Sequence, residues 1–223
     1  MLTNWYLIFT VALVESFLVS IGLTALMRWI SNRWNFVDHP GDRKIHTKPI
    51  PVLGGVAIYL TFNGVIFGNL IMLESAGYLG FDWLKEHVVQ FLDDSTWRPL
   101  LGVVAGGFVI FVLGVVDDLR ALKPEAKLVG QIVAALILVL SGIRLDLFIE
   151  PLLENTPFLN GLSDVAMGRL SVGVSGLVTM FWVIMMTNSM NFLDNMDGLA
   201  GGVAAIAAVS FFVCLLPHEE YFI

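Results

Sequence analysis

The chain has 223 residues, of which 57% are hydrophobic and only 14% are charged, and its mean hydropathy is +0.82. About a quarter of the residues in a soluble domain are charged, and a transmembrane helix needs about 20 consecutive, mostly apolar residues. The composition therefore excludes a soluble globular domain and predicts an all-α, polytopic bundle of transmembrane helices, and the net charge of −7 matters less than its distribution.

Six long apolar runs are candidate transmembrane spans. The first is too long for a signal peptide and contains Glu15, so we expect it to be retained. The fourth is short for a bilayer, so we expect it to tilt or to extend further. The runs cover residues 5–29, 52–73, 99–116, 128–143, 170–187 and 199–216. The one cysteine, Cys214, lies in the last run and excludes an intrachain disulfide and a Cys-rich zinc site.

Basic residues concentrate in the connections that follow odd-numbered spans. The first two of these connections, residues 28–51 and 117–127, hold eight of the twelve lysines and arginines, and the even-numbered connections hold most of the acids. Cytoplasmic loops of membrane proteins are enriched in Lys and Arg. We therefore predict that the N-terminus is outside and that the odd connections, including residues 188–198, face the cytoplasm.

Two outer connections have recognisable patterns. Residues 81–92 carry apolar side chains at a spacing that favours a helix lying at the membrane interface. Residues 155–169 are interrupted by Gly, Pro and Asn, which predicts a loop.

The first cytoplasmic connection combines basic residues with a glycine pair. Residues 38–55 read DHPGDRKIHTKPIPVLGG. Basic side chains beside a Gly–Gly turn can hold phosphate through charge and close backbone approach. Ordinary cytoplasmic charge that binds anionic lipid explains the same pattern. The candidate substrate-binding residues here are Arg43, Lys44, His46, Lys48, Gly54 and Gly55.

Two adjacent aspartates, Asp117 and Asp118, follow the uncharged third run. Negative charge at the C-terminus of a helix is unfavourable to the helix dipole, so the pair needs Lys127, Lys123, Arg120 or a divalent cation nearby. Adjacent residues project about 100° apart on a helix, so one carboxylate can bind a metal while the other orients or deprotonates a substrate group. Solvated acids at a helix end are the structural alternative.

Residues 188–202, NSMNFLDNMDGLAGG, hold many oxygen donors. On a helix, Asn191, Asp194 and Asp197 or Gly198 fall at i, i+3 and i+6 or i+7, on roughly one face. Two oxygen ligands one turn apart suit Mg²⁺, which takes its other oxygens from water and phosphates. Free N–H groups at the start of the sixth span would point to the same place. Helix capping is the structural alternative, and the spacing excludes an EF-hand.

Taken together, the three clusters put acids, amides, a lysine and a basic Gly–Gly loop on one predicted membrane face. Catalysis on phosphates consists mostly of positioning and charge neutralisation. The residues therefore predict a Mg²⁺-dependent reaction on a doubly phosphorylated substrate, and the membrane setting indicates a lipid as the second reactant.

These motifs resemble those of the polyprenyl-phosphate N-acetylhexosamine-1-phosphate transferases, glycosyltransferase family 4. The resemblance rests on Asp117–Asp118, on KLVGQ from Lys127 and on NFLDNMDGLAGG from Asn191, and it covers about residues 30–205. The first loop, with its DHP segment from Asp38 and its basic residues, is more similar to the GlcNAc-1-phosphate branch than to the phospho-MurNAc-pentapeptide translocase.

The resemblance implies transfer of an N-acetylhexosamine-1-phosphate, GlcNAc-1-phosphate in this branch, from a UDP-sugar to undecaprenyl phosphate. UMP is released, and Mg²⁺ or alternatively Mn²⁺ is the implied cofactor. The implied setting is the bacterial inner (plasma) membrane, with a cytoplasmic active site and a role in the first membrane step of cell-surface polysaccharide synthesis. Membrane lipid and a second copy of the chain are the further partners expected, and nucleic acid is not.

The same resemblance implies three catalytic residues. Asp117 would activate or position the lipid phosphate. Asp118 would support the diphosphate and the metal site. Lys127 would neutralise phosphate charge.

The later motif is implied to hold the metal and the nucleotide. Asn191 and Asp194 would be the metal ligands, and Asp194 would also line the nucleotide site. Asn195, Met196 and Asp197 would form the uridine pocket.

Members of that family have ten or eleven spans, a later metal-binding aspartate and a His-rich cytoplasmic loop. This sequence contains no counterpart of the later features. We therefore expect residues 1–223 to form a single transmembrane domain that is the N-terminal portion of a longer enzyme.

Two other functions account for part of these features. Asp197–Gly198 also begins the motif of CDP-alcohol phosphatidyltransferases, but the Ala-Arg and the two further aspartates of that motif are absent. An ion-coupled transporter could use Glu15, Asp117 and Asp118 as intramembrane charges. Such carriers have inverted repeats and broken helices at the middle of the membrane, whereas these acids gather at one edge.

The predicted sidedness can be tested by cysteine accessibility. Lys48→Cys should react with an impermeant thiol reagent only from the cytoplasmic face, and Asp93→Cys only from the outer face, because the two residues lie in successive connections. Labelling of both from the same side would contradict the topology.

Overall fold

The computed structural model describes residues 2–40, 47–76, 94–146, 149–156 and 163–215. The chain divides into two compact units, Met1–Gly130 and Gln131–Ile223, called here the first and the second unit. Each is described by itself. The predicted interfacial helix at residues 81–92 lies outside the described residues.

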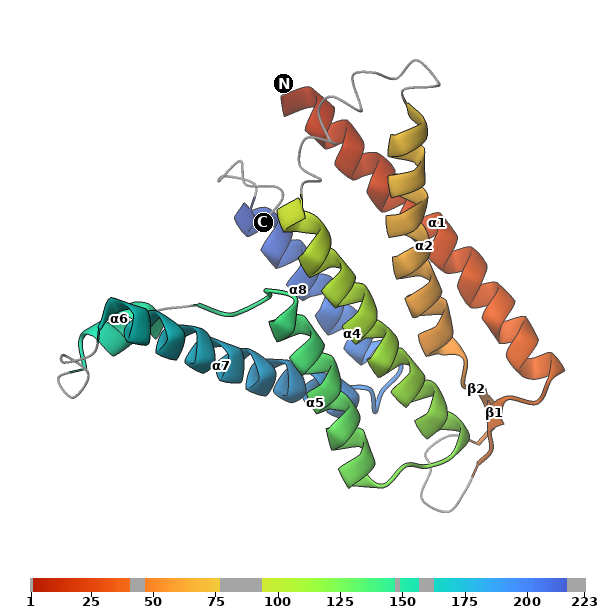
Figure 1. The fold of residues 1–223 in the computed structure, drawn as a ribbon. Helices are drawn as coiled ribbons and strands as arrows, with labels where there is room; N and C mark the ends of the chain where they lie inside the picture. The colour runs from red at the N-terminus through yellow and green to blue at the C-terminus, as the bar shows by residue number, and fades with distance from the viewer. Residues whose placement is uncertain (1, 41–46, 77–93, 147–148, 157–162, 216–223) are drawn as a thin grey trace. The chain divides into compact units, whose positions relative to one another are not determined.

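The first unit is built from long helices and one short ribbon (Figure 1). Helix α1 spans Leu2–Arg33, α2 spans Gly54–Ala76, α4 spans Asp94–Leu119, and α5, Pro124–Leu140, begins in this unit. Helix α2 packs against both α1 and α4. The strands β1, Val37–Asp38, and β2, Ile50–Pro51, pair antiparallel with Val37 opposite Pro51.

The ribbon is anchored to the end of α1. Asn35 has a φ of 56°, a left-handed conformation that ends the helix and turns the chain. The hydroxyl of Ser31 then donates to the carbonyl of Phe36, and the N–H of Val52 donates to the same carbonyl at 3.2 Å. These bonds hold the residues that lead into α2.

In its described residues the second unit contains the rest of α5 and three further helices. These are α6, Ile149–Glu154, α7, Asp164–Leu193, and α8, Leu199–Leu215; α7 packs against both of the others. The expected loop at residues 155–169 was wrong in its second half, because Ser163 caps α7 and the helix begins at Asp164. A Ser cap followed by an acid in the first turn favours helix initiation, and this signal outweighs the nearby turn residues.

Four helices in the described part of the chain are long and apolar enough to cross a membrane. They are Phe9–Arg33, Gly54–Met72, Thr96–Leu119 and Val165–Leu193. These correspond to the first, second, third and fifth expected spans, and the expected helical membrane fold is confirmed. The fourth and sixth expected spans form the 17-residue helices α5 and α8. Many large apolar side chains on these helices are exposed, as surfaces that face lipid tails require.

Small residues let the helices approach one another closely. A Cβ atom added to Gly130 of α5 would lie 2.9 Å from the methyl carbons of Leu113 on α4, and one added to Gly176 of α7 would lie 3.1 Å from Val139 on α5. Ala134 and Ala135 are almost completely buried. Lipid tails are as apolar as leucine, so membrane helices associate through this kind of close packing.

A reciprocal amide pair joins α5 to α7 in the second unit. The Nε2 of Gln131 donates to Oδ1 of Asn188 at 3.2 Å, and the Nδ2 of Asn188 donates to Oε1 of Gln131 at 2.8 Å. Asn188 also donates to the carbonyl of Ile184 at 2.8 Å. Gln131 is only 7% exposed. Because a buried amide without partners is costly, this pair specifies how the two helices meet.

A second polar contact joins α1 to α2. The Nδ2 of Asn69 donates to Oε2 of Glu15 at 3.0 Å and also to the carbonyl of Val65 at 2.8 Å. Glu15 lies inside a helix that can cross a membrane. The amide provides the partner that such a carboxyl group needs in an apolar environment.

Substitutions at Gly130 should reveal how closely α5 packs on α4. Gly130→Ala should cost little, because the Leu113 methyl groups can shift, whereas Gly130→Leu should lower the free energy of unfolding by about 1–3 kcal/mol through overpacking. Gly64→Leu on α2 is the matched control, since a Cβ atom there meets nothing within 4 Å. Thermal unfolding in detergent measures the difference, and equal effects of the two leucine variants would contradict the packing.

The Gln131–Asn188 pair can be measured by a double-mutant cycle. Gln131→Leu, Asn188→Leu and the double variant should show a coupling energy of about 0.5–1.7 kcal/mol, the range of interhelical hydrogen bonds in membranes. The readout is equilibrium unfolding in mixed detergent micelles. Additive effects of the single substitutions would show that the two amides do not interact.

Candidate active site

Asp117 is held by an ion pair and a backbone hydrogen bond in the first unit. It lies in the last turn of α4, where the N–H of Leu122 donates to its Oδ1 at 3.0 Å. The Nζ of Lys127, in the first turn of α5, lies 2.6 Å from its Oδ2. Of the three cations that the sequence offered for the aspartate pair, Lys127 is therefore the partner of Asp117.

The ion pair is accessible from solvent. The side chain of Lys127 is 39% exposed and that of Asp117 is 25% exposed. Water screens an exposed pair, so its contribution to stability is at most about 1 kcal/mol. An ammonium group has three N–H donors, and the bond to Asp117 uses one of them. The remaining donors give Lys127 the capacity to bind an anion while it orients the carboxylate.

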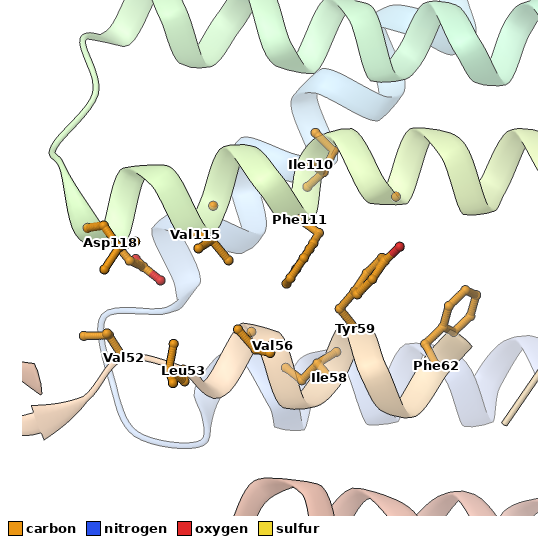
Figure 2. Close-up of a pocket in the computed structure, with 14 residues that line it drawn as sticks. Val52, Leu53, Val56, Ile58, Tyr59, Phe62, Ile110, Phe111, Val115 and Asp118 are labelled. Carbon is orange, nitrogen blue, oxygen red and sulfur yellow. The ribbon is translucent and has the colours of Figure 1, made fainter. Parts of the chain in front are cut away.

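Asp118 points to a different place from its neighbour. It lines an apolar cavity together with Leu53, which directly precedes α2 (Figure 2), and with residues of α2 such as Gly55. The divergence of the two carboxylates follows from the helical conformation of α4 up to Leu119. The side chain of Asp117 thus contacts the connection from α4 to α5, whereas that of Asp118 faces the cavity between α2 and α4.

The glycine pair of the first connection forms the start of a helix. Gly54 and Gly55 are the first two residues of α2, and a Cβ atom at either would meet nothing within 4 Å. The N–H groups of a helix's first turn have no partners within the helix. Lys48 is exposed just before β2. The other three basic residues predicted for this cluster, Arg43, Lys44 and His46, lie outside the described residues.

The oxygen donors of residues 191–197 lie at the end of α7 in the second unit. Asn191 occupies the last helical turn, and Asp194 is the capping residue, whose N–H donates to the carbonyl of Met190 at 3.1 Å. The one-face prediction for Asn191, Asp194 and Asp197 was wrong for Asp197. The helix ends at Leu193, so Asp197 belongs to a turn and not to a further helical turn.

Gly198 decides how this turn enters the next helix. Its φ is 78°, a conformation that costs a residue with a Cβ atom energy but costs glycine little. Helix α8 then begins at Leu199, whose N–H donates to the carbonyl of Met196 at 3.1 Å. Asn191, Asp194, Asn195, Met196 and Asp197 are all exposed. Their side chains are therefore available to a ligand.

Sequence reasoning did not include Gln131 and Asn188 among the site residues. Their pairing fixes α7 to α5 one turn before Asn191. The two amides therefore help to position Asn191, a candidate metal ligand, but are not candidate ligands themselves. The available signal was an amide within an otherwise apolar run, since a polar side chain in a membrane helix usually has a partner on another helix.

The donor set can be compared with the demands of Mg²⁺. Among the residues that the structure describes, no group of three or more His, Cys, Asp or Glu side chains could hold a metal ion. Mg²⁺ is usually bound by one or two carboxylates, with water and substrate phosphates as its other ligands. The exposed oxygens of Asn191 and Asp194, three residues apart, fit this sparse mode of binding.

The chain is similar to curated proteins of several bacteria. A probable undecaprenyl-phosphate N-acetylglucosaminyl 1-phosphate transferase of Bacillus subtilis is 28% identical over 214 residues, which cover 96% of this chain and 50% of that protein. A decaprenyl-phosphate N-acetylglucosaminephosphotransferase of Mycobacterium tuberculosis is 30% identical over 207 residues, 89% of this chain and 45% of that protein.

A third relative has a different name. The phospho-N-acetylmuramoyl-pentapeptide-transferase of Corynebacterium jeikeium is 27% identical over 214 residues, 86% of this chain and 53% of that protein. The chain spans about half the length of the curated relatives it matches. No solved structure matches it significantly.

The model of glycosyl transferase family 4 matches residues 100–223, which include Asp117, Asp118, Lys127 and the turn after α7. This match covers more than half of the chain, and the chain therefore belongs to glycosyl transferase family 4.

Proposed function

We propose that the protein takes part in transferring N-acetylglucosamine-1-phosphate from UDP-GlcNAc to undecaprenyl phosphate in the bacterial plasma membrane. The observation that carries this proposal is the similarity, over most of the chain, to relatives named for N-acetylglucosamine phosphate transfer to polyprenyl phosphates. The exposed Asp117–Lys127 pair at the end of an apolar helix supports it, because the reaction joins a lipid phosphate to a water-soluble donor.

In the proposed reaction an oxygen of the lipid phosphate attacks the sugar-linked phosphorus of the donor. The bond between that phosphorus and the oxygen bridging to UMP breaks, and UMP leaves with the electron pair. A diphosphate now links lipid and sugar. Both reactants are anions, so the site must supply cations and fixed hydrogen-bond donors.

Lys127 would provide one of these cations, and Asp117 would act on the lipid phosphate. Leu122 and Lys127 fix both oxygens of Asp117, which positions the carboxylate to hold or accept a proton from the lipid phosphate. The free donors of Lys127 then face phosphate charge beside it. Asp118 would support the diphosphate and the metal site from the face of α4 that lines the apolar cavity. The basic residues Arg43, Lys44, His46 and Lys48 and the N–H groups at Gly54 and Gly55 would bind phosphate.

The turn after α7 would hold the donor. When bound, Mg²⁺ supplies charge neutralisation for the diphosphate, and Asn191 and Asp194 are the residues that would ligate it. Asn195, Met196 and Asp197 would contact the uridine, for which their exposure in a short turn leaves room. We further propose that this site lies on the cytoplasmic face, since basic residues gather in the same predicted connections.

A phospho-N-acetylmuramoyl-pentapeptide donor is the second candidate. It is favoured by the similarity to the Corynebacterium jeikeium relative. The two candidates differ in the sugar transferred and not in the bonds made and broken, so one assay separates them.

The assay supplies membranes carrying the protein with Mg²⁺, undecaprenyl phosphate and labelled UDP-GlcNAc. We expect labelled lipid in the organic extract together with released UMP. Asp117→Asn should reduce turnover by about 100-fold or more, the contribution of a positioned acid–base group, because an amide cannot accept the proton. Asp146→Asn, the same change at an exposed aspartate that lies outside the candidate site, is the matched control and should leave turnover unchanged.

Two outcomes would count against the proposal. No labelled lipid with UDP-GlcNAc or with any other UDP-sugar would exclude the transferase function. Full activity of Asp117→Asn in correctly inserted protein would remove Asp117 from the site.

A further inference from the structure

Arg144 carries a guanidinium group that the reaction described above does not use. It lies in the second unit, just after the end of α5. Its Nε atom is buried and has no hydrogen-bond partner among the residues that the structure describes. The residue as a whole is only partly buried, so other atoms of the side chain reach the surface. A buried donor without a partner is costly, and this makes Arg144 a candidate binding group.

The chain turns back at the end of α5, so that Arg144 stays close to this end. Gly142 has a φ of 100°, and the N–H of Ile143 donates to the carbonyl of Leu138 at 3.1 Å. A left-handed glycine followed by a bond back to the last turn is a common way to end a helix. The residues after Leu140 therefore do not continue the rise of α5.

The main chain beside Arg144 is fixed to α7. The N–H of Leu145 donates to the hydroxyl oxygen of Thr179 at 2.8 Å, and this hydroxyl donates to the carbonyl of Ser175 at 2.7 Å. Thr179 is only 3% exposed and lies at the middle of the apolar segment Val165–Leu193, which is long enough to cross a membrane. The backbone that carries the guanidinium is thus held against an apolar part of α7.

The length of α5 places Arg144 within the apolar thickness of a bilayer. The helix has 17 residues and is about 26 Å long at 1.5 Å per residue, whereas the hydrocarbon core is about 30 Å thick. Lys127, in the first turn, is exposed and marks the polar edge at which α5 begins. The other end of the helix then lies below the opposite edge, and a charge there needs a compensating partner.

The partner must come from outside the described part of the chain. Asp146, two residues further on, is exposed and forms no ion pair with Arg144 in the described residues. A guanidinium group matches phosphate with two parallel hydrogen bonds. Free phosphate would have to leave water to reach an apolar layer, whereas the phosphate of a lipid already lies at its edge. Long arginine side chains extend toward this edge.

We propose that Arg144 binds the phosphate of a glycerophospholipid in the leaflet opposite to the Asp117–Lys127 pair. The bound headgroup would fix the depth of one end of α5 in the bilayer. Because α5 is a continuous helix, it would also fix the depth of Lys127 near the other end. The proposal requires only that α5 crosses the membrane, and it does not depend on which sugar the protein transfers.

The test is photolabelling of the full chain in nanodiscs. One probe is phosphatidylglycerol with a diazirine in its headgroup, and the matched probe is a diacylglycerol that carries the same diazirine but no phosphate. Mass spectrometry locates the labelled peptides. We expect the first probe to label residues 141–146 about tenfold more than the second, because only the first forms charge-assisted hydrogen bonds. Excess inorganic phosphate should not displace it.

Variants of Arg144 test the residue itself. Arg144→Gln should reduce labelling by the phosphatidylglycerol probe about tenfold, since the amide lacks the charge. Arg144→Lys should reduce it less, because an ammonium group keeps the charge but not the planar pair of donors. Arg169→Gln, the same change at an exposed arginine of α7, is the matched control and should leave the labelling unchanged.

Three results would overturn the assignment. They are equal labelling by the two probes, displacement of the first probe by inorganic phosphate, and undiminished labelling of Arg144→Gln. The comparison of the two probes uses the unaltered chain, so it decides the question without any variant having to fold.

Discussion

A carboxylate at the end of an apolar helix is stable only if something compensates its charge, and Asp117 shows how this chain meets that requirement. The helix dipole disfavours an acid in the last turn of α4. The ammonium of Lys127 and the N–H of Leu122 compensate for it, and in doing so they tie the connection and the start of α5 to the end of α4. The same contacts give the carboxylate one orientation and place a cation beside it. These contacts also provide the fixed carboxylate and the cation on which the proposed phosphate transfer depends.

The rest of the chain follows the same rule that polar groups in a membrane protein need partners. Gln131 and Asn188 satisfy each other between α5 and α7, and Asn69 satisfies Glu15 between α2 and α1. Elsewhere small residues allow close packing, as at Gly130, where a Cβ atom would meet the Leu113 methyl groups, and at Ala135, which is fully buried. Lipid competes equally for every apolar surface, so apolar packing alone does not fix which residues of two helices meet. The polar pairs provide this specificity.

Local patterns predicted most of the elements but not their ends. The apolar runs correctly indicated helices, and the charge of Asp117 correctly indicated Lys127 among its possible partners. The predicted loop at residues 155–169 rests on its Gly, Pro and Asn residues, whereas the cap at Ser163 begins α7 within that range. The end of α7 was missed because a helical repeat was extended through Asp194 to Asp197, although the left-handed Gly198 requires a turn there. The end of a helix depends on single residues such as Ser163 and Gly198, whereas the presence of a helix depends on the average hydrophobicity of many residues.

The sequence by itself determined the class of protein, the candidate residues and the resemblance to a transferase family, because composition and motif spacing are properties of the chain alone. The tertiary structure decided which candidates meet. It paired Asp117 with Lys127, turned Asp118 toward a cavity and brought Gln131 to Asn188, 57 positions away in the sequence. The apolar runs in the sequence do not determine which helix faces pack together, since any two apolar faces would bury a similar area. Only the packed helices select the faces, and with them the cavity between α2 and α4.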